Sequence, residues 1–307
     1  MSQLFPHDYS VPPTNKISST AERFPYDANR HLTPPPATVK EYNEFKHRLG
    51  ITHSVLTHGL SYGADCSCLT DFTSDLGQDA TKGIAVIDPS TVTSTQLKEM
   101  HINGIRGIRV NMYRYGAMHD VERQKEALRA HARALDTHCL GWSMAFTHTH
   151  PEFWAELEPV IAREVVPRGI QLVTDHFALL KGQSMLPAGC KDIMQQTGLQ
   201  EVLELVRAGY LYVKISAPYR VSTLAPGYED LRPLVRALLE ANPQQVLWGS
   251  DWPHTPLMKV RTREEALQVT PYLEVDDRAW LESLQSWLTD QEWHMLMVLN
   301  PRRLYDQ

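Results

Sequence analysis

The chain has 307 residues, of which 42% are hydrophobic and 21% charged, and its formal net charge is −6. This length can bury a large core and suits one barrel-type domain as well as two ordinary domains. The scattered Lys and Arg residues favour neither nucleic acid nor an anionic membrane as a partner. No apolar run approaches the length of a transmembrane helix. The four cysteines show no disulfide framework, which favours a cytoplasmic protein.

Apolar runs and amphipathic segments alternate along most of the chain. Residues 1–38 precede this alternation and are polar and proline-rich, which indicates an irregular N-terminal arm. The alternation itself is typical of repeated βα units around a parallel sheet. The expected strands are 54–58, 83–88, 107–111, 142–146, 170–176, 211–216 and 245–248. The expected helices are roughly 40–49, 66–76, 94–103, 120–136, 152–165, 197–208, 229–241, 277–286 and 289–299.

Seven strands with helices between them nearly complete a (β/α)8 TIM barrel. We therefore expect an α/β fold in which residues 39–307 form one distorted barrel as a single domain. The eighth strand should come first, within residues 8–20, although that segment has a poor strand pattern. A doubly wound open sheet is the alternative, but it usually carries a glycine-rich phosphate loop after an early strand, and the sequence has none.

The end of the last expected strand carries the most informative residues. Trp248-Gly249-Ser250-Asp251-Trp252-Pro253-His254-Thr255 places a carboxylate where an apolar strand ends, followed at once by a Trp-Pro turn and a histidine. In parallel α/β enzymes the carboxyl ends of the strands carry the chemistry. Asp251 is therefore a candidate general base or metal ligand, unless it only caps the following turn.

Histidines follow three of the other expected strands. They are His58, then His148 and His150, then His176 next to Asp175. In an extended segment His148 and His150 point to the same side, which suits a pocket wall or a metal site. Asp175 could fix the imidazole tautomer of its neighbour or of another group. Each of these residues could instead be an ordinary core, capping or loop residue.

Three cations are associated with the expected strands. Arg109 lies inside an apolar strand, where an unpaired charge is costly, so it should meet a carboxylate of the protein or of a substrate. Lys214 also lies inside a strand, and we expect it to pair with an internal acid. Arg220 lies beyond its strand, where a guanidinium can hold a substrate carboxylate in a bidentate fork. The sequence contains neither a Gly-x-Ser-x-Gly elbow nor a His-Glu-x-x-His helix.

Taken together, these residues resemble the amidohydrolase superfamily, in the branch that includes 2-pyrone-4,6-dicarboxylate lactonase. The resemblance runs over residues 22–305 and rests on Arg23-Phe24-Pro25-Tyr26, residues 83–89, residues 104–111, Asp175-His176, residues 248–254 and residues 300–305. It implies a distorted (β/α)8 barrel in which Asp251 activates water and His176 lies near the reacting carbonyl. It also implies that Arg109 and Arg220 bind substrate carboxylates or polarise the carbonyl.

The chain departs from this family at the first strand. The family has Asp-x-His-x-His there, whereas the corresponding place reads Pro12-Pro13-Thr14-Asn15-Lys16-Ile17. A divalent ion held by His176 and Asp251 would lack two of its usual ligands, unless His58, His148 or His150 replaced them. If Lys16 points inward, its ammonium lies close to the vacated site. Where the lactonase has a further basic pair after its fourth strand, this chain has Arg114-Tyr115.

The sequence thus predicts a metal-independent enzyme without a cofactor that hydrolyses a small lactone or cyclic ester carrying a carboxylate or enolic group. Asp251 is the expected general base, with His176 and Arg109 as the other catalytic residues. The expected substrate contacts are Arg220, His58, His148, His150, Arg114, Tyr115, Lys16 and His254. The expected partner is the small-molecule substrate, and a homo-oligomer is compatible with the sequence. The alternatives are a non-hydrolytic isomerase, cyclase or decarboxylase of secondary metabolism, and an inactive binding protein.

Overall fold

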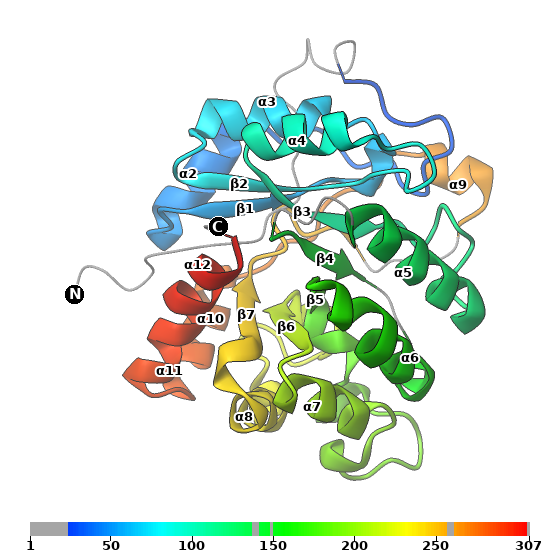
Figure 1. Cartoon of the computed structure of the whole chain (residues 1–307). Coiled ribbons are helices and arrows are strands. Elements are labelled where there is room, and N and C mark those ends of the chain that lie inside the picture. The colour runs from blue at the N-terminus through cyan, green and yellow to red at the C-terminus, as the bar shows by residue number, and fades with distance from the viewer. Residues whose placement is uncertain (1–23, 137–140, 148–149, 257–260, 306–307) are drawn as a thin grey trace.

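The computed structural model describes residues 24–136, 141–147, 150–256 and 261–305. One sheet organises this part of the chain, and all neighbouring strands in it are parallel and follow one another in sequence order. The strands are β1 (Ser54–Thr57), β2 (Thr81–Ala85), β3 (Ile105–Val110), β4 (Ser143–Phe146), β5 (Gln171–Thr174), β6 (Leu211–Ser216) and β7 (Val246–Gly249). Figure 1 shows that the sheet curls and that the helices lie outside it.

This strand order confirms the predicted barrel class. A doubly wound sheet reverses its strand order at a switch point, and the sequential order seen here has no such reversal. The eighth strand predicted within residues 8–20 lies outside the described residues. The division into an arm at 1–38 and one domain at 39–307 stays a prediction.

The helices fall close to their predicted ranges. They are α2 (Val39–Leu49), α3 (Ser67–Leu76), α4 (Ser94–Ile102), α5 (Val121–Asp136), α6 (Trp154–Val160), α7 (Leu199–Arg207), α8 (Arg232–Ala241), α9 (Arg263–Leu267), α10 (Asp277–Ser286), α11 (Asp290–His294) and α12 (Asn300–Tyr305). Two of these helices, α9 and α12, were not predicted from the sequence, and the second strand was expected at 83–88, whereas β2 begins at Thr81 and ends at Ala85. No helix in the described part of the chain is long and apolar enough to cross a membrane.

Local sequence explains where several helices begin. Thr38, Thr93, Thr262 and Thr289 each start a capping box, in which the threonine side chain accepts from a backbone N–H of the first turn and a Glu or Gln side chain accepts from the threonine N–H. Such a cap stabilises a helix by about 1 kcal/mol.

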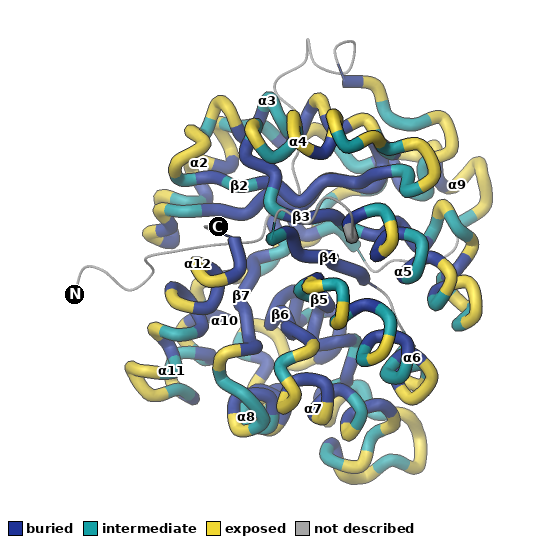
Figure 2. Tube along the Cα trace, viewed as in Figure 1, coloured by how far each residue is buried: buried dark blue, intermediate teal, exposed yellow. Residues whose placement is uncertain are grey.

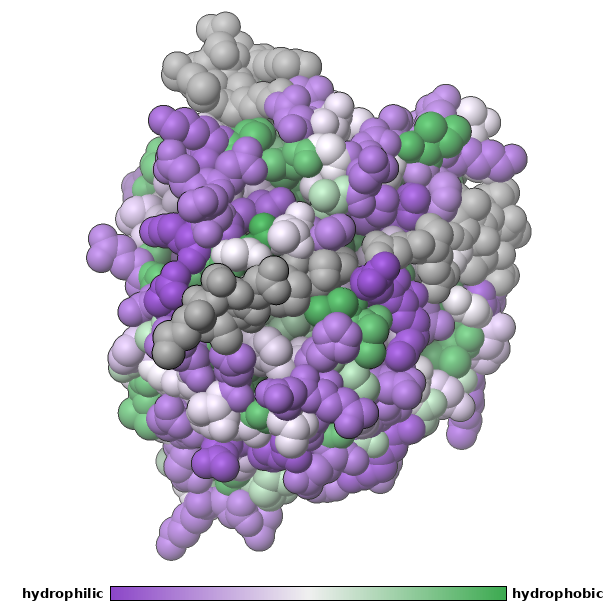
Figure 3. Space-filling view, turned by 90° about the vertical axis from the view of Figure 1, so that its left-hand side faces the viewer, coloured by the Kyte–Doolittle hydropathy of each residue, from purple (hydrophilic) through white to green (hydrophobic). Residues whose placement is uncertain are grey.

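The outer faces of the helices are exposed, and Figure 3 shows a largely hydrophilic face on which hydrophobic residues lie in small scattered groups.

The interior of the barrel is filled by side chains from nearly every strand. The strands are buried on both faces, as Figure 2 shows by their dark colour. The inward-facing cluster consists of Val55, Ile84, Ala145, Val173, Tyr212 and Leu247 from six strands, with Leu304 and Tyr305 from α12. Asn300 at the start of α12 donates to the carbonyl oxygens of Pro243 and Val246. The C-terminal helix therefore covers the amino end of β7, which leaves the carboxyl ends for the site.

The described part of the N-terminal arm lies against the loops that follow β1 and β7. Phe24 packs with Tyr62, the Thr33 hydroxyl donates to the Ala266 carbonyl at 2.7 Å, and the Tyr272 hydroxyl donates to Pro35 at 2.6 Å. These contacts hold an irregular segment in place without regular secondary structure. They bring the residues between 27 and 36 to the carboxyl rim of the sheet.

Candidate active site

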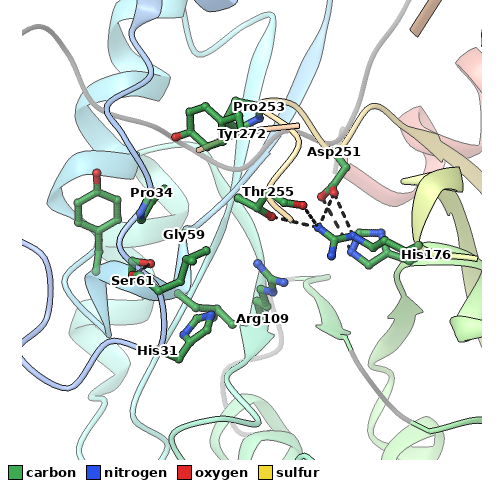
Figure 4. Close-up of a pocket in the computed structure, with 14 residues that line it drawn as sticks. His31, Pro34, Gly59, Ser61, Arg109, His176, Asp251, Pro253, Thr255 and Tyr272 are labelled. Atoms are coloured by element: carbon green, nitrogen blue, oxygen red, sulfur yellow. Dashed lines mark hydrogen bonds and ion pairs between the residues drawn. The ribbon is translucent and has the colours of Figure 1, made fainter. Parts of the chain in front are cut away.

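A pocket lies at the carboxyl ends of the strands, next to the N-terminal arm (Figure 4). It is lined by His31, Leu32, Pro34, Gly59, Leu60, Ser61, Tyr62, Arg109, His176, Arg220, Asp251, Pro253, Thr255 and Tyr272. The three residues predicted to be catalytic, Asp251, His176 and Arg109, are therefore brought together in one cavity. Tyrosine, proline and leucine side chains supply the apolar part of the wall, as is usual for small-molecule pockets.

Asp251 follows β7 and is fixed by two neighbours. Its Oδ2 accepts from the Tyr219 hydroxyl at 2.5 Å and from Arg220 Nη2 at 3.0 Å and Nε at 3.3 Å. Burial alone would raise the pKa of this carboxyl group, but the Arg220 guanidinium, His176 and the hydrogen bonds outweigh burial and hold its pKa below the usual value. Asp251 is therefore ionised at neutral pH, and its Oδ1 lies 3.9 Å from His176 Nε2.

The backbone around the site is strained at three strand ends. After β7, Asp251 has φ 61°; after β6, Ala217 has φ 45°; and after β5, His176 through Leu179 have φ between 53° and 60°. For residues other than glycine this left-handed conformation costs on the order of 1–3 kcal/mol each. Such strain persists only where surrounding contacts impose it, and it is concentrated at functional sites.

Arg220 is held by the protein on several sides. Its side chain is 2% exposed, and besides Asp251 it donates to the Thr255 carbonyl at 2.8 Å, to Thr255 Oγ1 at 3.0 Å and to the Pro256 carbonyl at 3.2 Å. The sequence predicted a fork for a substrate carboxylate. In the structure the carboxylate that this guanidinium contacts is Asp251, so its clear effect is to position the acid and keep it charged.

His176 follows β5 and contacts the neighbouring strand. Its backbone N–H donates to Ser216 Oγ at 3.2 Å, and its ring Nδ1 lies 2.9 Å from the same oxygen. Burial lowers the pKa of His176 to about 4. Repulsion from Arg220 and Arg109 acts in the same direction, and the nearby acids Asp251 and Asp175 oppose it only in part. The imidazole is therefore neutral at physiological pH.

Arg109 reaches into the pocket from β3. Its Nε and Nη2 donate to Thr147 Oγ1 at 3.2 and 2.9 Å, and the Thr147 hydroxyl donates to Asp175 Oδ2 at 3.1 Å. Asp175 Oδ1 in turn accepts from Lys214 at 2.6 Å, which confirms that Lys214 pairs with an internal acid. Within the described ranges, no carboxylate lies within 4.0 Å of the Arg109 guanidinium. Burial lowers the pKa of Arg109, but an arginine remains charged.

Two predicted substrate contacts lie behind the pocket wall. His58 is fully buried next to Tyr62, with ring centroids 5.9 Å apart, and its burial lowers its pKa to about 4. His254 is also buried, and its Nε2 lies 2.9 Å from Asp277 Oδ2. Neither residue lines the cavity.

The other predicted contacts are farther along the rim or cannot be placed. His150 Nε2 lies 2.8 Å from His119 Nδ1, Arg114 pairs with Asp88 at 2.8 Å, and Tyr115 packs edge-on against His131. None of these lines the cavity of Figure 4. Lys16 and His148 lie outside the described residues.

Several residues of the pocket wall that can form hydrogen bonds to a ligand were not predicted from the sequence: His31, Ser61, Tyr62, Thr255 and Tyr272. His31 comes from the N-terminal arm, points into the cavity near Arg109 in Figure 4, and stacks on Tyr113 at 4.0 Å with an interplanar angle of 9°. Burial, then Arg109 and Arg261, lower its pKa to about 4, so it is neutral. The arm has no periodic pattern, and nothing in the sequence singles His31 out.

The described residues do not fit the divalent metal that the superfamily implies. His176 and Asp251 are the two potential ligands close to each other in the pocket, since Asp175 is turned toward Lys214. No group of three His, Cys, Asp or Glu side chains in the described segments could hold an ion. Arg220, 3.0 Å from Asp251 Oδ2, supplies the positive charge next to this carboxylate.

An acid, a neutral histidine and two arginines at the carboxyl rim of a sequential parallel sheet are the arrangement of a TIM-barrel enzyme. A family model described as Amidohydrolase matches residues 11–307, so the chain belongs to the amidohydrolase family. The predicted superfamily and the predicted amidohydrolase class of enzyme are thereby confirmed.

The relatives of this chain include lactone hydrolases. It is 27% identical over 289 residues to a 4-sulfomuconolactone hydrolase of Hydrogenophaga intermedia, covering 93% of this chain and 84% of that protein. It is 26% identical over 304 residues to a 2-pyrone-4,6-dicarboxylate hydrolase of Comamonas testosteroni, covering 94% and 87%. A solved structure of a probable 2-pyrone-4,6-dicarboxylic acid hydrolase from Acinetobacter baumannii, with citric acid bound, matches with a TM-score of 0.70 at 20% identity and covers 98% of this chain and 100% of that chain.

Proposed function

We propose that this protein hydrolyses a small lactone that carries a carboxylate or a similar anionic group, without a metal ion. The observation that carries the proposal is the Arg109 guanidinium, which contacts the pocket and has no carboxylate partner within 4.0 Å in the described part of the chain. A half-buried charge without a carboxylate partner is costly unless a ligand compensates it. The two relatives described above are named for a sulfomuconolactone and for a pyrone dicarboxylate, which are lactones with anionic groups. Their names support the same class of substrate for this chain.

In this reaction Asp251 is the general base. Oδ2 is occupied by Tyr219 and Arg220, so Oδ1 accepts a proton from water as the water oxygen bonds to the acyl carbon. His176, which is neutral, donates a hydrogen bond to the carbonyl oxygen as it becomes negative. The tetrahedral intermediate then expels the ring oxygen, which takes the proton from Asp251, so that the net change is addition of water across the acyl C–O bond.

The role of Arg109 follows from its place on the opposite wall of the pocket. Its remaining donors can bind the anionic group of the lactone in a charge-assisted contact, and this orients the acyl carbon toward Asp251. His31, neutral and stacked on Tyr113, adds a polar contact from the arm.

The test is hydrolysis in water enriched in oxygen-18. The purified protein should open 2-pyrone-4,6-dicarboxylate or 4-sulfomuconolactone faster than an uncharged lactone, and one solvent oxygen-18 should enter the new carboxylate. The protein should keep this activity after dialysis against a chelator. Turnover without oxygen-18 in the product would overturn the hydrolase proposal in favour of the isomerase, cyclase or decarboxylase alternative. Absence of turnover with every anionic lactone tested would favour the alternative that the protein is an inactive binding protein.

A further inference from the structure

Ser216 is a buried serine in direct contact with His176. It ends β6, is 1% exposed, and its Oγ lies within hydrogen-bond distance of both the backbone nitrogen and the ring Nδ1 of His176. Those are the two hydrogen bonds that this hydroxyl makes with described residues. Because both of these contacts involve His176, the position of the hydroxyl proton can be deduced from them.

The backbone N–H of His176 can only donate, so Ser216 Oγ is the acceptor of that hydrogen bond. The hydroxyl of Ser216 still has one proton to donate, and His176 Nδ1, 2.9 Å away, is the acceptor within reach. If Nδ1 carried the ring proton instead, it would donate to Oγ, and the serine proton would be buried without an acceptor. A buried donor without an acceptor is unfavourable, so the first arrangement is preferred.

We propose that Ser216 is a positioning residue that fixes neutral His176 in the tautomer with the proton on Nε2. In this state His176 presents an N–H on the side of Asp251, whose Oδ1 lies 3.9 Å from Nε2. His176 is then a hydrogen-bond donor, and Asp251 is left as the base. This inference rests on the proposed lactone hydrolysis for its catalytic consequence, but the tautomer itself does not depend on the substrate.

The same tautomer distinguishes His176 from a histidine that binds a metal ion. An imidazole binds a metal through a nitrogen without a proton, and Ser216 places the proton on Nε2, the nitrogen nearest to Asp251. In a metal-binding histidine the partner of the other nitrogen accepts a hydrogen bond from its N–H. Ser216 has the opposite function, because its own backbone contact makes it a donor to Nδ1. The tautomer therefore explains why the described residues at this site suit hydrogen-bond catalysis.

The test is a nitrogen-15 NMR spectrum of histidine-labelled protein near neutral pH, in which the His176 signals are assigned by their loss in His176→Gln. We expect a protonated Nε2 and an unprotonated Nδ1. In Ser216→Ala the signals should move toward a mixture of the two tautomers, and kcat on an anionic lactone should fall by about 10–100-fold at nearly unchanged KM. Ser216→Thr, which keeps the hydroxyl, should restore both.

Ser54→Ala is the matched control, because Ser54 is equally buried on β1 and bonds to Tyr42 away from the pocket. It should leave the His176 signals and kcat unchanged. A protonated Nδ1 in the unsubstituted protein would overturn the proposal, as would an unchanged tautomer in Ser216→Ala. Because the spectrum needs no substrate, failure of lactone hydrolysis with the Nε2 tautomer present would count against the proposed function alone.

Discussion

The charged side chains on the two sides of the pocket differ in how they are paired. On the side of β6 and β7, Asp251 is matched by Arg220 and Tyr219, and Arg220 is further held by backbone carbonyls. On the side of β3 and β4, Arg109 reaches its nearest acid, Asp175, through the Thr147 hydroxyl, and Asp175 is already paired with Lys214. The contrast fits the proposed reaction, in which the side with the paired charges would perform the proton transfer and the side with the unpaired positive charge would bind an anionic substrate.

Removing the base should have the largest effect. In Asp251→Asn the side chain keeps its size but cannot take a proton from water, so kcat should fall by about 10²- to 10⁴-fold. Asp277→Asn is the matched control, since Asp277 is also a buried acid beside a histidine but lies outside the cavity. The control should lower the melting temperature and leave kcat nearly unchanged. Steady-state kinetics on one anionic lactone suffice, and retained activity in Asp251→Asn would contradict the role of this carboxylate.

Removing the partner of the base should cost stability as well as activity. Arg220→Met leaves the Asp251 carboxylate buried without its cation, and the free energy of unfolding should drop by about 3–5 kcal/mol at neutral pH. Denaturant unfolding followed by circular dichroism measures this change. The drop should shrink as the pH falls and Asp251 takes up a proton. A variant as stable as the parent at neutral pH would show that the ion pair does not fix this side of the pocket.

The pH dependence of kcat/KM should follow from the same contacts. Asp251, with its lowered pKa, and His176, with a pKa of about 4, are both in their working forms at neutral pH. Activity should therefore be level from neutrality into the mildly acidic range and should fall once Asp251 becomes protonated, because a protonated His176 would still donate from Nε2. In Arg220→Met, burial is no longer opposed by the guanidinium, so the pKa of Asp251 rises and the acid limb should move to higher pH. An acid limb in the same place in both proteins would contradict this control by Arg220.

His31 should have the smallest effect. His31→Phe keeps the stacking on Tyr113 but removes the ring nitrogens, so we expect KM to rise by about threefold to tenfold with little change in kcat. His150→Phe is the control, because His150 lies at the rim and does not line the cavity. If both substitutions change KM equally, the arm does not contribute to the pocket.

The sequence predicted the parts of the site that follow from strand periodicity. Asp251 and His176 each follow an apolar run, and in a parallel sheet such positions meet at one rim. It could not predict that Thr147 and Ser216 link neighbouring strands, because those contacts depend on the register of β4, β5 and β6. Nor could it place His31, because the arm is held by tertiary contacts instead of a repeating pattern.

His58 and His254 show the opposite error. Both stand next to strand ends, as functional residues do, but their side chains pack behind the wall against Tyr62 and Asp277. The sequence pattern predicts that a residue lies near the end of a strand. It does not predict where the side chain points, because that depends on the backbone conformation of the loop after the strand. His254, for example, has φ 66°, which no pattern in the sequence indicates.

The most direct measurement compares an anionic lactone with its neutral methyl ester in the parent protein, in Arg109→Met and in Arg106→Met. Arg106 lies on the same strand, donates to backbone carbonyls and does not line the cavity, so it is the matched control. If Arg109 binds the anionic group, the parent and Arg106→Met should prefer the anionic lactone in kcat/KM by about 10–100-fold, and Arg109→Met should lose most of that preference. An equal preference in all three proteins would contradict the claim that this side of the pocket leaves its charge for the substrate.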